Sequence, residues 1–172
     1  MDLPPPIILP YGKDYHLFMS FCKEDEERAF LLFKELEEKF NLKCLYHIRD
    51  FTPGVTVTDN ILNGIEKSMK IVYLVSQKFK ENFMCKTEML YGIMASHKLC
   101  ENSMIPVLLE NIEMPRELQT INYVDATLEG IDVSEKIYKA CLFGGLILLE
   151  YIFVHEFQHM QNIKICSKEY TI

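Results

Sequence analysis

The clearest candidate for metal chemistry is the pattern His155-Glu156-Phe157-Gln158-His159. On a helix, His155 and His159 would share one face and could bind zinc, with Glu156 as the general base of a hydrolase. Catalytic zinc also requires a third protein ligand and a shaped cavity. Glu169 lies too close to serve as the usual distant ligand, and only about 13 residues follow the motif. We therefore predict no metal centre and interpret the match as fortuitous or as an adventitious metal site.

Cysteine thiols are the second candidate for chemistry. Lys86 stands beside Cys85 and could lower the pKa of that thiol. Cys44 lies near the stretch Arg49–Gly54. The sequence shows neither a C-x-x-C pair nor a His and an acid placed to activate a thiol nucleophile. We therefore interpret the thiols as reduced and buried or half-buried. The six cysteines are Cys22, Cys44, Cys85, Cys100, Cys141 and Cys166.

The stretch Arg49-Asp50-Phe51-Thr52-Pro53-Gly54 separates an apolar run from a helical pattern. Pro53 fixes its own φ, and Gly54 supplies backbone freedom that a side chain would forbid. Together they can hold Arg49, Asp50 and Phe51 out from the scaffold in one shape. The alternative is an ordinary strand-to-helix turn, because Pro-Gly is a common turn signal.

This hexapeptide resembles the BB loop of the Toll/interleukin receptor homology (TIR) domain, and its flanks resemble other parts of that family in the correct order. The resemblance runs from about Asp14 to Phe143 and is strongest to the Toll-like receptor branch. The further matching segments are Tyr15–Phe21, Asp59–Ser68, Met84–Met89 and Ile105–Glu110.

The resemblance implies a signalling module that associates homotypically with other TIR domains. These domains would belong to further copies of this chain, to a receptor or to an adaptor. It implies that the loop Arg49–Gly54 docks against a neighbour, with Phe51 giving apolar area and the charges giving orientation. We expect a weak homo-oligomer without a bound cofactor. A decoy that engages TIR partners without passing on a signal remains an alternative.

The resemblance also implies an enzymatic alternative at Glu88. Family members that cleave NAD use a Glu at this position of the third helix as the catalytic acid. A carboxylate beside a cleft can stabilise the cationic ribosyl centre as nicotinamide departs. In this chain Met84 replaces the usual Trp and removes an aromatic wall, so a purely structural Glu88 is the other interpretation. We favour a non-enzymatic module, with NAD as substrate only in the alternative.

Composition is consistent with one globular domain. The chain has 172 residues, of which 49% are hydrophobic and 25% charged, and its net charge is −7. The absence of a Lys/Arg-rich block argues against nucleic acid as a partner. The Pro-rich start reads as neither a signal nor a transit peptide, so we expect a cytoplasmic protein. The apolar run 142–154 is too short and interrupted for a membrane span.

Strand and helix patterns alternate along the chain. Five apolar runs predict strands, at Tyr15–Phe21, Leu42–Ile48, Ile71–Val75, Ile105–Leu109 and Tyr123–Ala126. Helical patterns cover Glu24–Phe40, Val57–Met69, about Lys86–Leu99 and a helix from about Val133. We predict Thr56 as an N-cap and a capping box at Asp132–Glu135.

This alternation predicts an α/β fold, a five-stranded parallel sheet flanked by helices on both faces, TIR-like and flavodoxin-like. Pro106 cannot donate to a ladder, which places its strand near an edge. In such sheets, sites gather in loops beyond the carboxyl ends of the strands. We divide the chain into an extended lead-in over 1–13, a TIR domain over 14–143 and an apolar extension over 144–172.

Overall fold

The computed structural model describes residues 4–99 and 103–142. Its centre is a five-stranded parallel sheet in the order β2-β1-β3-β4-β5. The order and parallel pairing confirm the predicted α/β architecture, which has the flavodoxin-like pattern. The strands are β1 (Tyr15–Ser20), β2 (Cys44–Leu45), β3 (Ser68–Val75), β4 (Met104–Leu108) and β5 (Val124–Asp125).

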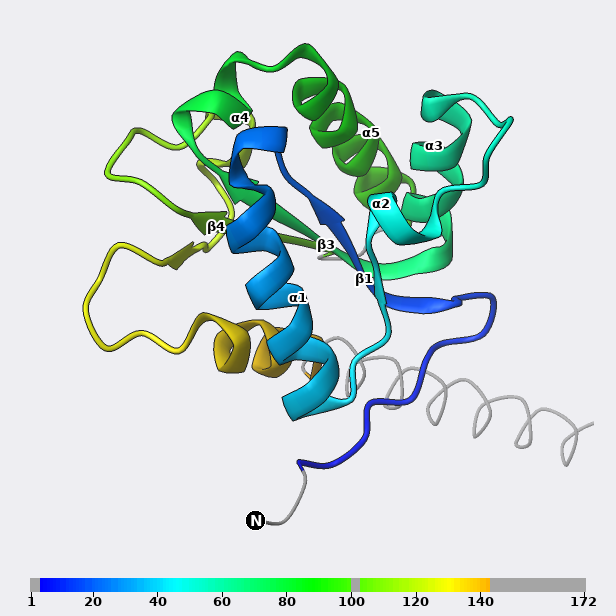
Figure 1. Ribbon diagram of the computed structural model, residues 1–172, viewed down its shortest axis with the longest axis horizontal. Coiled ribbons are helices and arrows are strands. Elements are labelled where there is room, and N and C mark those ends of the chain that lie inside the picture. The colour runs from blue at the N-terminus through cyan, green and yellow to red at the C-terminus, as the bar shows by residue number, and fades with distance from the viewer. Residues whose placement is uncertain (1–3, 100–102, 143–172) are drawn as a thin grey trace, which may run out of the picture.

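Helices cover both faces of the sheet (Figure 1). On one face, α1 (Glu26–Phe40) and a helix over residues 133–142 pack against β1 and β3. On the other face, α3 (Val57–Lys67), α4 (Gln77–Glu81) and α5 (Phe83–Leu99) form a second apolar cluster. Neighbouring residues of a strand point to opposite faces of the sheet. Leu17 and Phe18 of β1 are both buried, one in each apolar cluster, so both faces of the sheet require a cover of helices.

The first helix begins later than predicted, and its buried apolar stripe is the predicted one except at Phe30. A short 3-10 turn, η1 (Lys23–Asp25), precedes α1, and Asn41 ends the helix with φ of 52°. Asn is one of the few residues that enters this left-handed region readily. We expected Phe30 in the stripe, but its side chain is 43% exposed. The buried positions are Ala29, Phe33, Leu36 and Phe40.

The second strand is much shorter than the predicted Leu42–Ile48. After Leu45 the chain turns into a short helix, α2 (His47–Asp50), which leaves Ile48 56% exposed. The prediction was wrong because the chain leaves β1 after Leu45, where Asp50 accepts from the Tyr46 amide and holds the first turn of α2. The second helix also ends earlier than predicted, at Lys67, and β3 takes over the rest.

The remaining elements follow the predictions closely. Pro106 lies opposite Tyr73 of β3, and β5 pairs with β4 only from Val107 onward, so no β5 ladder bond is lost. The Asp132 carboxylate caps the helix over 133–142 by accepting from the Glu135 amide at 2.8 Å. The helix predicted from about Lys86 is α5, which starts three residues earlier, at Phe83. The extension 144–172 lies outside the described residues.

The lead-in lies along the domain. His16 of β1 accepts from the Lys43 amide at 2.7 Å, and its other ring nitrogen bonds the Ile7 carbonyl at 2.8 Å. The Tyr138 hydroxyl donates to the Pro5 carbonyl.

Within residues 4–99 and 103–142, no helix is long and apolar enough to cross a membrane.

Candidate functional site

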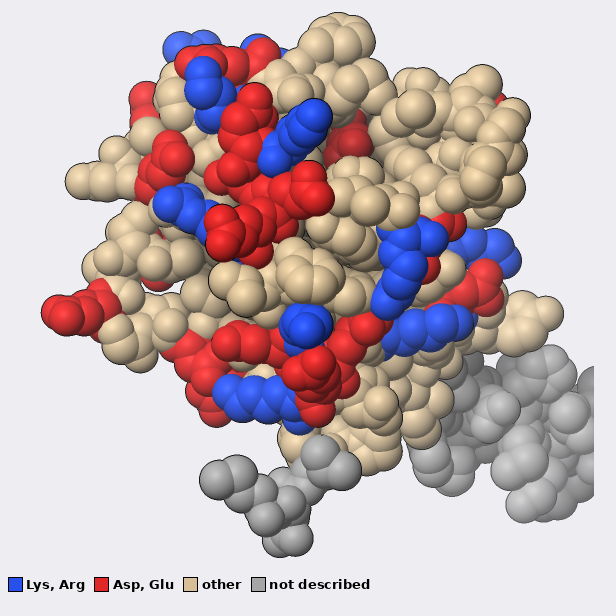
Figure 2. Space-filling view, viewed as in Figure 1, with Lys and Arg blue, Asp and Glu red and all other residues tan. Residues whose placement is uncertain are grey.

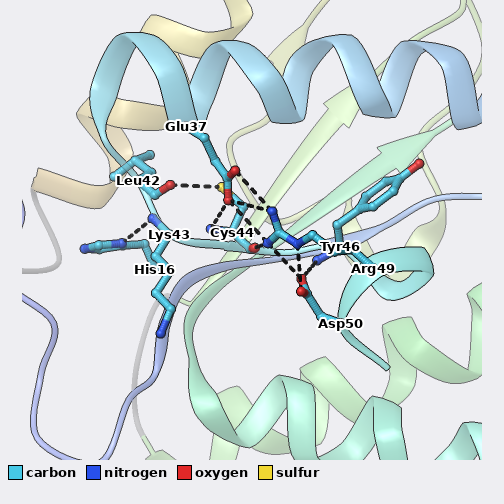
Figure 3. Close-up of polar contacts among 8 residues, drawn as sticks. All are labelled: His16, Glu37, Leu42, Lys43, Cys44, Tyr46, Arg49 and Asp50. Carbon is cyan, nitrogen blue, oxygen red and sulfur yellow. Dashed lines mark hydrogen bonds and ion pairs between the residues drawn. The ribbon is translucent and has the colours of Figure 1, made fainter. Parts of the chain in front are cut away.

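The predicted contact loop begins inside α2. Arg49 donates to the Cys44 carbonyl at 2.8 Å, to Asp50 at 2.7 Å and to Glu37 of α1 at 3.2 Å (Figure 3). Its guanidinium also lies 4.8 Å from the centre of the Phe33 ring. The hydrogen bond that Arg49 donates to Asp50, together with Glu37, raises the pKa of Arg49. Arg49 therefore ties the end of β2 to α1.

Asp50 is also held inward. Its carboxylate accepts from the Tyr46 amide at 2.8 Å and so caps the first turn of α2 (Figure 3). We expected Arg49, Asp50 and Phe51 to project from the scaffold; Asp50 and Phe51 are instead partly buried, whereas the Arg49 side chain is 47% exposed although it bonds back to the scaffold. A charged side chain next to an unpaired backbone carbonyl or amide group forms a hydrogen bond with it, which holds the side chain against the scaffold. Phe51 is half-buried against the α3 and α5 cluster, with its ring centre 5.8 Å from that of His47.

The exposed part of the loop is its tip, Thr52–Val55. Gly54 has φ of +82°, which side chains rarely adopt, and an added Cβ would meet nothing within 4 Å. Thr56 accepts from the Asp59 amide at 3.1 Å, so the predicted N-cap is confirmed and the tip ends where α3 begins.

Sequence reasoning missed Asn60, which anchors the loop from inside. Its side-chain oxygen accepts from the Thr52 amide at 2.9 Å, and its amide donates to the carbonyls of Thr52, Val55 and Thr56. Asn60 is buried at a helical position where an apolar residue would continue the stripe of Ile61 and Ile65. A buried Asn must find partners, and that signal was available in the sequence.

The second candidate residue, Glu88, lies on α5 at the carboxyl end of the sheet. Ser20, the last residue of β1, donates a short hydrogen bond to its carboxylate. Burial raises the pKa of Glu88 to about 7, although the Ser20 hydrogen bond opposes this change. The carboxyl is therefore poised to exchange a proton near neutral pH.

The neighbours of Glu88 are buried and uncharged. Tyr73 of β3 is fully buried, and burial followed by the Glu88 charge raises the pKa of its hydroxyl. That hydroxyl makes no hydrogen bond to any residue the structure describes. Gly92 allows the close approach of α5, because an added Cβ would lie 1.8 Å from the Tyr73 oxygen.

The structure does not activate the thiol of Cys85, for which the sequence suggested a lowered pKa. Cys85 is buried, and burial followed by the Glu88 charge raises its pKa to about 12, so Lys86 does not activate it. Burial also raises the pKa of Cys22 to about 12. Cys22, Cys44, Cys85 and Cys141 are all free and buried, as predicted. Cys100 and Cys166 lie outside the described residues.

The predicted His155, Glu156 and His159 pattern also lies outside the described residues. Among residues 4–99 and 103–142, no group of three His, Cys, Asp or Glu side chains is placed to hold a metal ion. The described site therefore offers two features at one edge of the sheet. One is an exposed, braced loop tip, and the other is the half-buried Glu88 carboxyl.

A parallel sheet in this order, with a braced loop leaving β2 and a polar residue beside β1, defines a flavodoxin-like α/β domain whose site lies at the carboxyl edge. The TIR domain family model matches residues 17–139. The chain belongs to the TIR domain family, and the resemblance seen in the sequence is confirmed.

Relatives and solved structures agree with this assignment. A Toll-like receptor 4 of Pinctada imbricata is 33% identical over 101 residues, 57% of this chain and 11% of the relative. The TIR domain of the Toll-related receptor TRR-2 from Hydra magnipapillata superposes with a TM-score of 0.59 at 26% identity, covering 75% of this chain and 95% of that one. A metazoan TIR-STING receptor from C. gigas gives 0.68 at 23% identity, covering 80% and 43%. This chain spans about a tenth of the length of the curated relatives it matches.

Proposed function

We propose that this chain is a signalling module that works by homotypic association with other TIR domains through the loop Arg49–Gly54. The observation that carries the proposal is the exposed tip Thr52–Val55, held in one shape by Asn60 and by the positive φ of Gly54. A pre-shaped loop loses little conformational entropy on binding. Similarity to Toll-like receptors supports a role in innate immune-type signalling.

Residues within the loop have different roles in this proposal. The tip, including exposed Val55, contacts the partner, and exposed Val57 adds apolar area beside it. Arg49 and Asp50 act from behind by fixing the direction in which the loop leaves β2. A loop that enters a different surface of the next molecule makes a head-to-tail contact, which need not close. Such contacts are weak singly and strong in an array.

The test replaces Pro53 by His and measures self-association by sedimentation velocity over a concentration series. Pro53→His changes the exposed tip without touching the core, so we expect association to weaken about tenfold or more with the circular dichroism spectrum unchanged. Pro6→His, the same change at an exposed proline of the lead-in, is the matched control. Normal assembly of Pro53→His, or its global unfolding, would refute the role of the loop.

A second candidate function rests on Glu88. We infer that an NAD glycohydrolase would use this carboxyl to stabilise the ribosyl cation as nicotinamide leaves. The attraction between a carboxylate and a cation is stronger in a partly buried site, because the local dielectric constant is low. The pKa near 7 and the location at the carboxyl end of β1 favour it. Met84, half-buried in the α3 and α5 cluster, offers no aromatic stacking there.

Concentrated protein incubated with NAD separates the two functions. Release of nicotinamide that disappears in Glu88→Ala, while Glu38→Ala on the exposed side of α1 retains it, would identify an enzyme. Oligomer size should be followed in the same samples. Assembly without NAD consumption leaves the association module as the function.

A further inference from the structure

A groove of about 580 Å³ opens beside the first turns of α1, next to α2. Its apolar surface comes from Phe30, Tyr46 and Ile48. Phe30 and Ile48 are 43% and 56% exposed, although both are large apolar side chains. The groove is shallow and open to solvent, so it suits a protein surface laid over it and not an enclosed small ligand.

The rim of this groove is acidic. Glu24, Glu26 and Glu27 line it together with a single cation, Lys23. Figure 2 shows acidic side chains gathered over this end of α1. Glu27 takes part in none of the ion pairs among the described residues. An acidic rim around an apolar floor selects a partner surface that is apolar in the middle and basic around it.

This chain carries an exposed apolar surface on α5 with one lysine beside it. Phe83, Leu90 and Met94 are 77%, 50% and 67% exposed, and their spacing places them on one side of the helix. Exposed Lys86 lies beside them on the same side and, like Glu27, joins none of the described ion pairs. We call these four residues the α5 ridge. Lys80, just before the ridge, donates to the Glu113 carbonyl.

We propose that the α5 ridge of one copy of this chain docks into the acidic groove of a second copy. The proposal rests on the proposed function in one respect, namely that the chain self-associates. Lys86 would face Glu27 and its neighbours, while Phe83 and Leu90 would cover Phe30 and Ile48. The match is electrostatic as well as apolar, which favours a copy of this chain over an unrelated acidic partner.

The geometry makes this contact head-to-tail. The groove lies on α1, against one face of the sheet, and the ridge lies on α5, against the other. One molecule can therefore offer its groove and its ridge to two different neighbours at the same time. Such a contact propagates instead of closing, and it uses surfaces other than the loop tip.

Charge reversal tests the pairing. Glu27→Lys cancels the net negative charge of the groove and places a cation opposite Lys86, and Lys86→Glu gives an acidic ridge facing an acidic groove. We expect each variant alone to self-associate about fivefold more weakly than the unchanged chain. An equimolar mixture of the two should recover the original association, because each substituted position then faces a residue of opposite charge in the other variant.

Two controls carry the same charge changes elsewhere. Glu38→Lys lies on α1 three turns beyond the groove, and Lys136→Glu lies on the helix over 133–142. Both should leave association unchanged, and added salt should weaken the unchanged chain. Failure of the mixture to recover, or equal losses in the controls, overturns the proposal.

Pro53→His distinguishes this inference from the proposed loop contact. If Pro53→His abolishes association and the groove and ridge variants do not alter it, the loop proposal stands and the groove proposal fails. If the reverse is found, the loop proposal fails and the groove proposal stands. Loss in both sets of variants, with recovery in the mixture, supports both contacts.

Discussion

The half-buried carboxyl of Glu88 should make the stability of this domain depend on pH. Burial raises its pKa from 4.5 to about 7, so the folded state binds a proton more tightly than the unfolded chain. The contribution of Glu88 to the free energy of unfolding is therefore greatest below pH 4.5 and declines as the pH rises through 7. Because one pKa unit is worth about 1.4 kcal/mol, the loss from this residue between pH 5 and pH 8 is about 2.5 kcal/mol.

Glu88→Gln removes the titration but keeps a side-chain oxygen that can accept from Ser20. We expect the variant to equal the original chain near pH 5 and to exceed its free energy of unfolding by about 2.5 kcal/mol at pH 8. Urea denaturation at pH 5, 6, 7 and 8 measures this difference. Taking the variant and the original at each pH cancels the contribution of all other carboxyls.

Glu38→Gln, at an exposed site on α1, is the matched control and should follow the original chain at every pH. A constant difference between Glu88→Gln and the original across this range would refute the reasoning, because it would mean that Glu88 titrates alike in both states. A difference that grows toward low pH would show that the folded state favours the carboxylate instead of the acid.

Three further changes test the structure around the site. Asn60→Ala should cost about 2 kcal/mol in urea unfolding and weaken loop-dependent association, because the Thr52 amide loses its partner; unchanged stability contradicts this. Tyr73→Phe should raise the free energy of unfolding by about 1 kcal/mol, since the buried hydroxyl has no partner in the described part of the chain, and a loss would reveal one. Asp132→Ala should lower the melting temperature by removing a cap worth about 1 kcal/mol; an unchanged melting temperature would show that the cap contributes nothing.

Local signals predicted most of the fold. The strands around Phe18 and Val72 are continuous apolar runs, which only a sheet covered on both faces can bury. The caps at Thr56 and Asp132 are short-range hydrogen bonds, so the sequence contains both partners within a few residues. The left-handed turn at Gly54 follows from glycine itself.

The errors came where distant segments compete for the same residues. Arg49 reads as a free charge in the loop, yet it bonds Glu37 of the preceding helix and the Cys44 carbonyl. Ile48 has a high strand propensity but lies beyond the point where β1 can pair with β2. In both cases a tertiary contact or its absence overrode the local preference.

The sequence by itself determined the family, through its ordered motifs, and the alternation of strands and helices, because both are carried by residues close along the chain. Only the tertiary structure decided which side chains meet at the site. Ser20 and Glu88 are 68 residues apart, and the burial that raises the pKa of Glu88 comes from β1, β3 and α5 together. A pKa, a buried hydrogen bond or a groove depends on the three-dimensional surroundings of a group, and no local pattern contains them.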